Sequence, residues 1–181
     1  MIRAATISPC GKYRVDLTRT WDDRPVLVVC LFNPSNADHQ IDDPTVTLLC
    51  HIASFNGFGG IKVVNGIPLR SSTPKPALQM LEWHKTSEWY DRDRLQQNLA
   101  HIQTLVATAG AVLLAWGALA GQTEAAANWF EFVREEIENE LPEGTPVYCL
   151  GKTKGGYPKH PMARGKHKVP KDAPLILWSS T

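Results

Sequence analysis

Short, mainly apolar runs occur along this chain, and longer amphipathic stretches separate them. The runs cover Val26–Phe32, Ile61–Val64, Ala111–Trp116 and Val147–Leu150. Runs of this kind are typical of buried parallel strands, because both faces of such strands are covered by other elements. The pattern therefore predicts four central strands.

The stretches between these runs have the periodicity of amphipathic helices. Asp43 and Pro44 suit the cap and the first turn of a helix that ends near Asn56. A second helix is predicted over roughly residues 91–108, and a third over the stretch that precedes Pro142. The alternation of strands with helical crossovers favours parallel pairing of the strands.

The N-terminal stretch follows a different period. Residues 11–22 alternate apolar with polar side chains, which predicts a half-buried strand at a sheet edge. The whole pattern predicts an α/β fold, a three-layer α/β/α sandwich with a central, mainly parallel four-stranded sheet plus this N-terminal edge strand. We expect residues 1–181 to form a single α/β domain, on which the basic C-terminal loop and tail, residues 151–181, pack. Residues 77–90 are ambiguous, although their aromatic side chains indicate a packed excursion.

Composition narrows the class of protein. The hydrophobic content of 43% is ordinary for a globular domain, and no apolar run approaches the ~20 residues of a membrane helix. The first residues lack the charged start and the apolar core of a signal peptide. We therefore expect a soluble, cytoplasmic protein with no membrane partner.

Neither metal nor disulfide chemistry is indicated. The cysteines show no CxxC pair, and the six histidines show no metal-binding spacing such as HExxH. We expect no bound metal and no cofactor.

Charge is unevenly distributed, although the net charge is only +1. Residues 152–171 contain seven Lys or Arg and no acidic residue. Such a run is usually a solvated surface, and charge alone favours that interpretation. The alternative is a local basic face for phosphates, for which the candidates are Lys152, Lys154, Lys159 and Arg164.

Polar and glycine residues stand where the predicted strands end. Asn33-Pro34-Ser35 follows the first apolar run, Asn65 ends the second, and Trp116-Gly117 ends the third. Ligands of open parallel sheets bind beyond the carboxyl ends of the strands, so we expect these residues to lie along one edge. Asparagines are common turn formers. Two of them together, however, offer the donors and acceptors that reading the edge of a nucleobase requires.

Titratable side chains follow in the same loops. Asp43 is explained most simply as a helix cap, so Asp38 and Asp42 are the better candidates for a water-activating base or a ligand contact. A loop histidine is usually solvated, yet His160 would be suited to donate to a developing anion if it lay in a cleft.

Two familiar catalytic motifs are not matched. GKTKGG, residues 151–156, lacks both the GxxxxGK[ST] pattern and the following helix of a phosphate-binding loop. NPSNA, residues 33–37, is not the GxSxG of a nucleophile elbow. Neither Walker-type NTP hydrolysis nor serine hydrolysis is indicated.

Two resemblances follow from these motifs. NPSNAD with the following DDPT, then VVN and LGKTKGGYPKHP, resemble a widespread family catalogued only as a domain of unknown function, from about Cys10 to Leu175. The same order of motifs is more distantly similar to the uracil-DNA glycosylase superfamily. LFNPS places Asn33 on the catalytic Asn or Asp of that superfamily, and VVNGIPLR places Asn65 on its base-reading asparagine, with Arg70 following. LAWG resembles its third-strand turn, and the HPMA that begins at His160 resembles its HPSP loop.

The glycosylase resemblance implies a mechanism and a set of roles. A flipped-out base is read by Asn65, His160 stabilises the departing base, and Asn33, with Asp38 or Asp42, positions the attacking water. The implied partner is a nucleic acid, with DNA favoured, or a nucleotide. Two other functions stay open, a non-catalytic binding module and a small-molecule hydrolase that reuses the pocket. The residues expected to bind substrate beside these are Pro34, Ser35, Arg70, Trp116 and Gly117.

Overall fold

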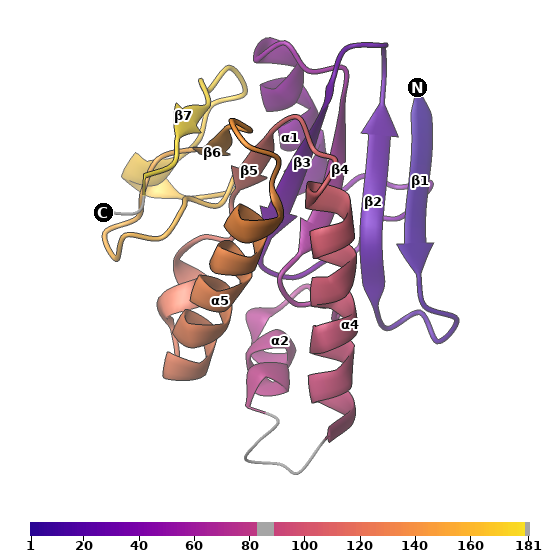
Figure 1. Cartoon of the computed structure of the whole chain (residues 1–181), viewed down its shortest axis with the longest axis vertical. Coiled ribbons are helices and arrows are strands. Elements are labelled where there is room, and N and C mark those ends of the chain that lie inside the picture. Colours follow the sequence, from indigo (N-terminus) through magenta and orange to yellow (C-terminus); the bar gives the residue numbers. More distant parts are fainter. Residues whose placement is uncertain (83–88, 180–181) are drawn as a thin grey trace.

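A seven-stranded sheet forms the centre of the computed structural model, which describes residues 1–82 and 89–179 (Figure 1). The sheet order is β1-β2-β4-β3-β5-β6-β7. Strands β4, β3, β5 and β6 pair in parallel, whereas β2 and β7 run antiparallel to their neighbours. The strands are β1 (Ile2–Ile7), β2 (Arg14–Thr20), β3 (Val26–Leu31), β4 (Gly60–Asn65), β5 (Val112–Leu114), β6 (Val147–Cys149) and β7 (Ile176–Leu177).

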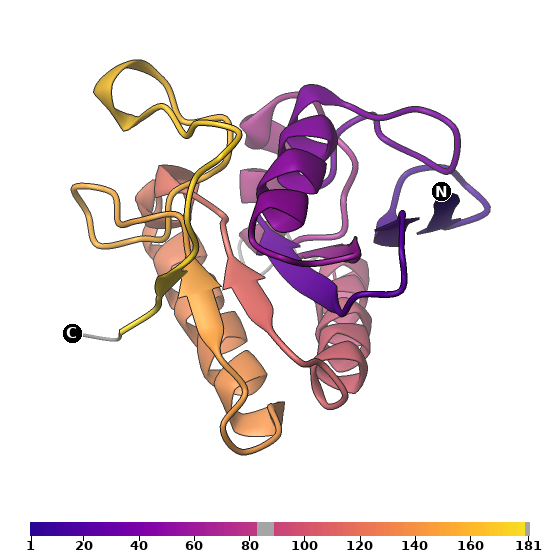
Figure 2. The same ribbon diagram turned by 90° about the horizontal axis from the view of Figure 1, so that it is seen from above.

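Helices cover both faces of the sheet (Figure 2). Alternate residues of β3 face opposite sides, as the pleat of a strand requires. Val29 packs in one apolar cluster with α1, whereas Cys30 packs in another with α4 and α5. The helical segments are α1 (Pro44–Phe55), α2 (Pro74–Leu81), α4 (Trp89–Val106), α5 (Glu124–Glu140) and the short 3-10 turns η1 (Ala118–Gly121) and η2 (Gly165–His167).

The C-terminal loop lies on the same face of the sheet as α1. Val169 and Ala173 are buried in the α1 cluster. Asn56, the residue that ends α1, donates from Nδ2 to the Ala173 carbonyl at 2.9 Å and accepts from the Leu175 N–H at 3.0 Å. A single side chain therefore ties the end of α1 to the C-terminal loop.

The mixed α/β fold with parallel central strands is confirmed. The predicted cap of α1 is also confirmed, because Asp43 Oδ1 accepts from the Val46 N–H at 2.9 Å. The ambiguous segment 77–90 contains the end of α2 and the start of α4, while residues 83–88 lie outside the described residues. Within the described part of the chain, no helix has both the length and the apolar character that crossing a bilayer requires.

The predicted edge position of the N-terminal strand is wrong. Strand β2 lies between β1 and β4, and β1 is the edge strand. The polar residues that alternate along β2 were expected to face solvent, but Arg14 and Asp16 of that face are buried. Arg19, which falls on the opposite face of the strand, is buried as well. Buried charges of this kind need polar partners, and loops and a helix supply them here. Asp16 Oδ2, for example, accepts from Nε2 of His101 in α4 at 2.9 Å.

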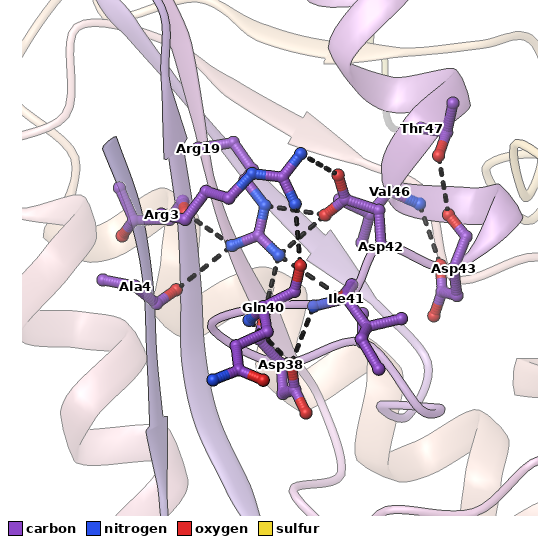
Figure 3. A network of polar contacts seen from close by, with 12 residues as sticks. Arg3, Ala4, Arg19, Asp38, Gln40, Ile41, Asp42, Asp43, Val46 and Thr47 are labelled. Carbon is purple, nitrogen blue, oxygen red and sulfur yellow. Dashed lines mark hydrogen bonds and ion pairs between the residues drawn. The ribbon is translucent and has the colours of Figure 1, made fainter. Parts of the chain in front are cut away.

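The loop between β3 and α1 wraps around the guanidinium of Arg19 and contacts it (Figure 3). The Arg19 side chain is 0% exposed, and its Nε lies 2.7 Å from Asp42 Oδ1. The same guanidinium donates to the carbonyl of Asp38 at 2.5 Å, and Arg3 pairs with the other oxygen of Asp42 at 3.1 Å. The start of α1 is thereby fixed against the N-terminal hairpin.

Replacing Arg19 with Met should lower the free energy of unfolding by about 3 kcal/mol. The change removes one partner of a buried ion pair and leaves loop carbonyls without a hydrogen-bond donor. Urea denaturation followed by circular dichroism measures this. Arg24→Met is the matched control, since Arg24 pairs with Asp22 in solvent and its loss should leave stability nearly unchanged. Equal effects of the two substitutions would contradict the structural role of Arg19.

Candidate functional site

Two adjoining cavities lie at the carboxyl ends of the central strands. The smaller, of about 220 Å³, is lined by the loop after β3, the first turn of α1 and the residues before α2. The larger, of about 460 Å³, is lined by Phe32, Trp116, Gly117 and the η1 turn. Asn33 and His160 line both cavities. These two predicted residues, 127 positions apart by their numbers (160 − 33), are therefore brought together.

Asn33 is held by its amide nitrogen. Nδ2 donates to the carbonyl oxygens of Pro34 at 3.1 Å, Leu69 at 3.3 Å and Ser71 at 3.0 Å. These bonds join the loop after β3 to the loop after β4. Oδ1 has no hydrogen-bond partner among residues 1–82 and 89–179, so the carboxamide can offer an acceptor to a ligand or a water.

His160 is fixed as a neutral donor. Its Nδ1 accepts from the backbone N–H of Met162 at 3.1 Å, which assigns the ring proton to Nε2. Burial lowers the pKa of His160 to about 4, only partly opposed by the negative charge of Asp43. At neutral pH the imidazole therefore carries one proton and no charge.

Gly117 allows His160 to lie close to the backbone at the end of β5. Gly117 has a φ of +81°, a left-handed conformation that side chains rarely adopt, and its N–H donates to the Pro158 carbonyl at 2.8 Å. A Cβ at this position would lie 2.8 Å from Cβ of His160. Both the backbone conformation and the free space at residue 117 are needed to place His160.

The basic motif GKTKGG forms a hairpin that supports His160. The Thr153 N–H donates to the Tyr157 carbonyl at 2.7 Å, and the Lys159 N–H donates to the Gly151 carbonyl at 2.8 Å. The glycines of this motif therefore allow the chain to turn, and Gly156 has a φ of +84°.

Asp43 is the carboxylate that lines the smaller cavity. Asp38 and Asp42, the two candidates from the sequence, are engaged elsewhere. Asp38 Oδ1 accepts from the N–H groups of Gln40 and Ile41, both at 2.8 Å, and Asp42 is held between Arg3 and Arg19. Neither residue lines the two cavities, so Asp43 is the acidic residue of this loop that the fold places at them.

Asn65 lies beneath the smaller cavity. It is 1% exposed, and its Oδ1 accepts from Arg14 Nη2 at 3.1 Å. Arg14 itself lines the cavity. In this arrangement the Asn65 side-chain oxygen holds an arginine, and Asn65 lines neither cavity, while its Nδ2 has no hydrogen-bond partner among the described residues.

The family model described as "Protein of unknown function (DUF1643)" matches residues 14–162. The chain belongs to the DUF1643 family. The match begins at Arg14 and ends two residues after His160, so it includes every residue that lines the two cavities. No curated protein and no solved structure matches the chain.

Other predicted residues of this DUF1643 protein support the cavities from outside. Arg70 binds two other loops, donating to the carbonyls of Ser35 at 3.5 Å and Asn36 at 3.3 Å after β3, and to that of Gly11 at 3.1 Å between β1 and β2. The carbonyl of the buried Pro34 accepts from the Ser71 N–H at 2.8 Å, whereas Ser35 lines the smaller cavity.

Aromatic side chains form a wall of the larger cavity. Phe32 stacks on Phe130 with ring centroids 4.8 Å apart, and Trp116 packs against Phe130 at 5.2 Å. Trp116 is 2% exposed, and its Nε1 is a buried donor with no acceptor in the described part of the chain.

The predicted basic residues are divided between several places. Lys152 donates to the Ser179 carbonyl at 2.6 Å and lies 4.8 Å above the ring of Trp178. Lys154 is exposed in the hairpin turn, and half-buried Lys159 follows it. Arg164 instead lines a groove of about 950 Å³ between α1 and the loop at 161–171, beside His51, Lys168 and Lys171. Only this last group flanks α1 and hence the neighbourhood of Asp43.

Sequence reasoning missed Arg14, the loop at 71–74 and the cavity position of Asp43. The sequence carries no local signal for Arg14, because the alternation along β2 does not show what its polar face contacts. A signal for Asp43 exists, since a helix that starts directly after a strand-end loop places its cap at that edge.

Substituting Gly117 with Ala should lower the free energy of unfolding by more than the about 1 kcal/mol expected for strain at positive φ alone, because it also displaces His160. Gly144→Ala is the matched control, since Gly144 has a φ of +80° with nothing within 4 Å of the added Cβ. Urea denaturation compares them. A smaller loss for Gly117→Ala than for Gly144→Ala would show that the contact with His160 is unimportant.

The titration of His160 should be visible in stability. Its folded pKa of about 4 lies below the ordinary 6.5, so the unfolded chain binds the proton more readily between these values. The free energy of unfolding should therefore fall as pH drops from about 6.5 to about 4. His160→Gln should lose this part of the pH dependence, and NMR of the imidazole should show no titration above pH 5. An imidazole that titrates near pH 6.5 would contradict the neutral donor.

Proposed function

We propose that this DUF1643 protein is a nucleobase-recognising hydrolase that cleaves the N-glycosidic bond of a normal or modified base in DNA or a nucleotide. The observation that carries the proposal is the convergence of Asn33, Asp43 and neutral His160 on one pair of adjoining cavities. The resemblance of the motifs around Asn33, Asn65, Trp116 and His160 to uracil-DNA glycosylases supports the same reaction.

His160 is the group that acts on the departing base. As the bond between base and sugar breaks, its electrons move onto the base and negative charge develops on a ring oxygen or nitrogen. The Nε2–H of a neutral imidazole donates a hydrogen bond to that atom without a proton having to be removed or added first. A preorganised donor of this type typically contributes about 3–4 kcal/mol to stabilising the transition state.

Asn33 and Asp43 act on the water. Asn33 Oδ1 accepts one hydrogen of the attacking water, which orients an oxygen lone pair toward the sugar carbon. Asp43 supplies the carboxylate that takes up the proton and offsets the positive charge on the sugar. Its other task, capping α1 through Oδ1, fixes its position relative to Asn33.

The larger cavity is the proposed place of the base. Phe32 and Trp116 line it, and Trp116 Nε1 is a donor that a base carbonyl could satisfy. If the substrate is a duplex, flipping the base out costs a few kcal/mol in lost stacking and pairing. The groove that contains Arg164, Lys168 and Lys171 is the proposed contact for the phosphates of such a polymer.

The reaction is tested by base release. The protein is incubated with labelled oligonucleotides that contain uracil or other modified bases and with a parallel panel of nucleotides; abasic sites are cleaved by alkali and free bases are separated chromatographically. His160→Ala should lower the rate by about 10²–10³-fold. Asp43→Asn should also lower it while keeping the protein folded, because asparagine caps helices as well as aspartate does.

Asp22→Asn is the control for these substitutions, since Asp22 lies in the turn before β3, at the other end of that strand. It should leave the rate unchanged. No release from either panel would overturn the hydrolase proposal, and tight binding of a base without release would favour a non-catalytic binding module.

A further inference from the structure

Arg14 is a buried cation whose hydrogen bonds go to neutral oxygens. It is 2% exposed, and it donates to the Ala37 carbonyl and to Asn65 Oδ1, each at 3.1 Å. Its Nε has no acceptor among the described residues, and in the same part of the chain no carboxylate lies within the 4.0 Å of an ion pair. An arginine has five N–H groups, so several remain for a ligand.

Burying a charge without a counter-ion is costly, because water no longer solvates it. Burial lowers the pKa of Arg14 to about 10, which still leaves the side chain protonated at neutral pH. A buried guanidinium that lines a cavity in this state is one that an oxyanion would stabilise.

The surroundings of the cavity favour the same kind of ligand. Arg70 is a second arginine, and among the described residues it donates only to backbone carbonyls. It lies close enough to lower the pKa of Arg14. Asp43 is the one carboxylate among the cavity's lining residues, and its charge favours the protonated form of Arg14. With Arg70 counted beside the cavity, two arginines stand against this one carboxylate. The first turns of α1 and α2 also meet at this cavity, and a helix N-terminus carries partial positive charge.

Hydroxyl groups complete the lining. Ser35, Thr45 and Ser72 line the cavity, as does Thr73, whose side chain makes no capping bond to α2. Hydroxyls beside an arginine fit the several oxygens of a phosphate better than the two of a carboxylate.

We propose that the smaller cavity binds a phosphate monoester, with Arg14 as its principal contact. Because this cavity shares Asn33, Leu119 and His160 with the larger one, the two could hold the phosphate and the base of a single nucleotide. This inference rests on the proposed function, which places the base in the larger cavity. It makes the substrate a nucleoside monophosphate rather than a polymer.

The test measures binding with the full chain, by calorimetry and by the shift in melting temperature. The ligands are inorganic phosphate, acetate, nucleosides and their 5′-monophosphates. Phosphate should raise the melting temperature, acetate should not, and each monophosphate should bind at least about tenfold more tightly than its nucleoside. No effect of phosphate would overturn the proposal. Acetate binding as tightly as phosphate would also overturn it, because the ligand would then be a carboxylate.

Thr45→Asp is the decisive variant. It adds a negative charge to the cavity, yet an acidic residue in the first turn of a helix is favourable, so α1 should remain folded. Phosphate binding should fall by more than about tenfold. Thr104→Asp makes the same chemical change at an exposed position of α4 that lines neither the two cavities nor the groove, and it should keep phosphate binding. Equal loss in both variants, or in neither, would refute the site.

The outcomes separate this inference from the hydrolase proposal. Phosphate binding that is sensitive to Thr45→Asp, without release of a base, would support the phosphate site and refute the hydrolase proposal. Release of a base from oligonucleotides, without binding of phosphate or preference for monophosphates, would do the reverse.

Discussion

The candidate site depends on charges buried beneath the loop between β3 and α1. Strand β2 supplies two arginines to this loop, and each reaches a different part of it. Arg19 binds Asp42 and the Asp38 carbonyl, whereas Arg14 binds the Ala37 carbonyl. Loops are usually the most mobile part of such a fold. Here the backbone groups of the loop are paired with cations, so Asn33 and Asp43 at its two ends are held at fixed positions.

Local patterns predicted what is decided locally. The cap of α1 was predictable because Asp43 and Pro44 act on their own helix, whatever the rest of the chain does. The parallel strands were predictable because both faces of each are buried, which leaves an apolar run. The convergence of Asn33 and His160 followed from a rule about strand ends rather than from either residue.

Other features depend on contacts that alternation along a chain does not contain. A period of two shows that the two faces of β2 differ, but not that the polar face meets loops instead of water. For the same reason the buried state of Arg14 could not be predicted. Asp38, Asp42 and Asp43 are near neighbours in sequence, and only the path of the loop around Arg19 decides which of them reaches the cavity.

The hydrogen bond from Met162 N–H to His160 assigns a chemical task to a backbone atom. The Met162 side chain is exposed, so many residues would serve at this position. Proline would not, because it has no N–H to donate. The ring would then be free to move its proton to Nδ1, and the nitrogen left at Nε2 would accept hydrogen bonds instead of donating them. The donor character of His160 Nε2 therefore requires only that residue 162 is not proline.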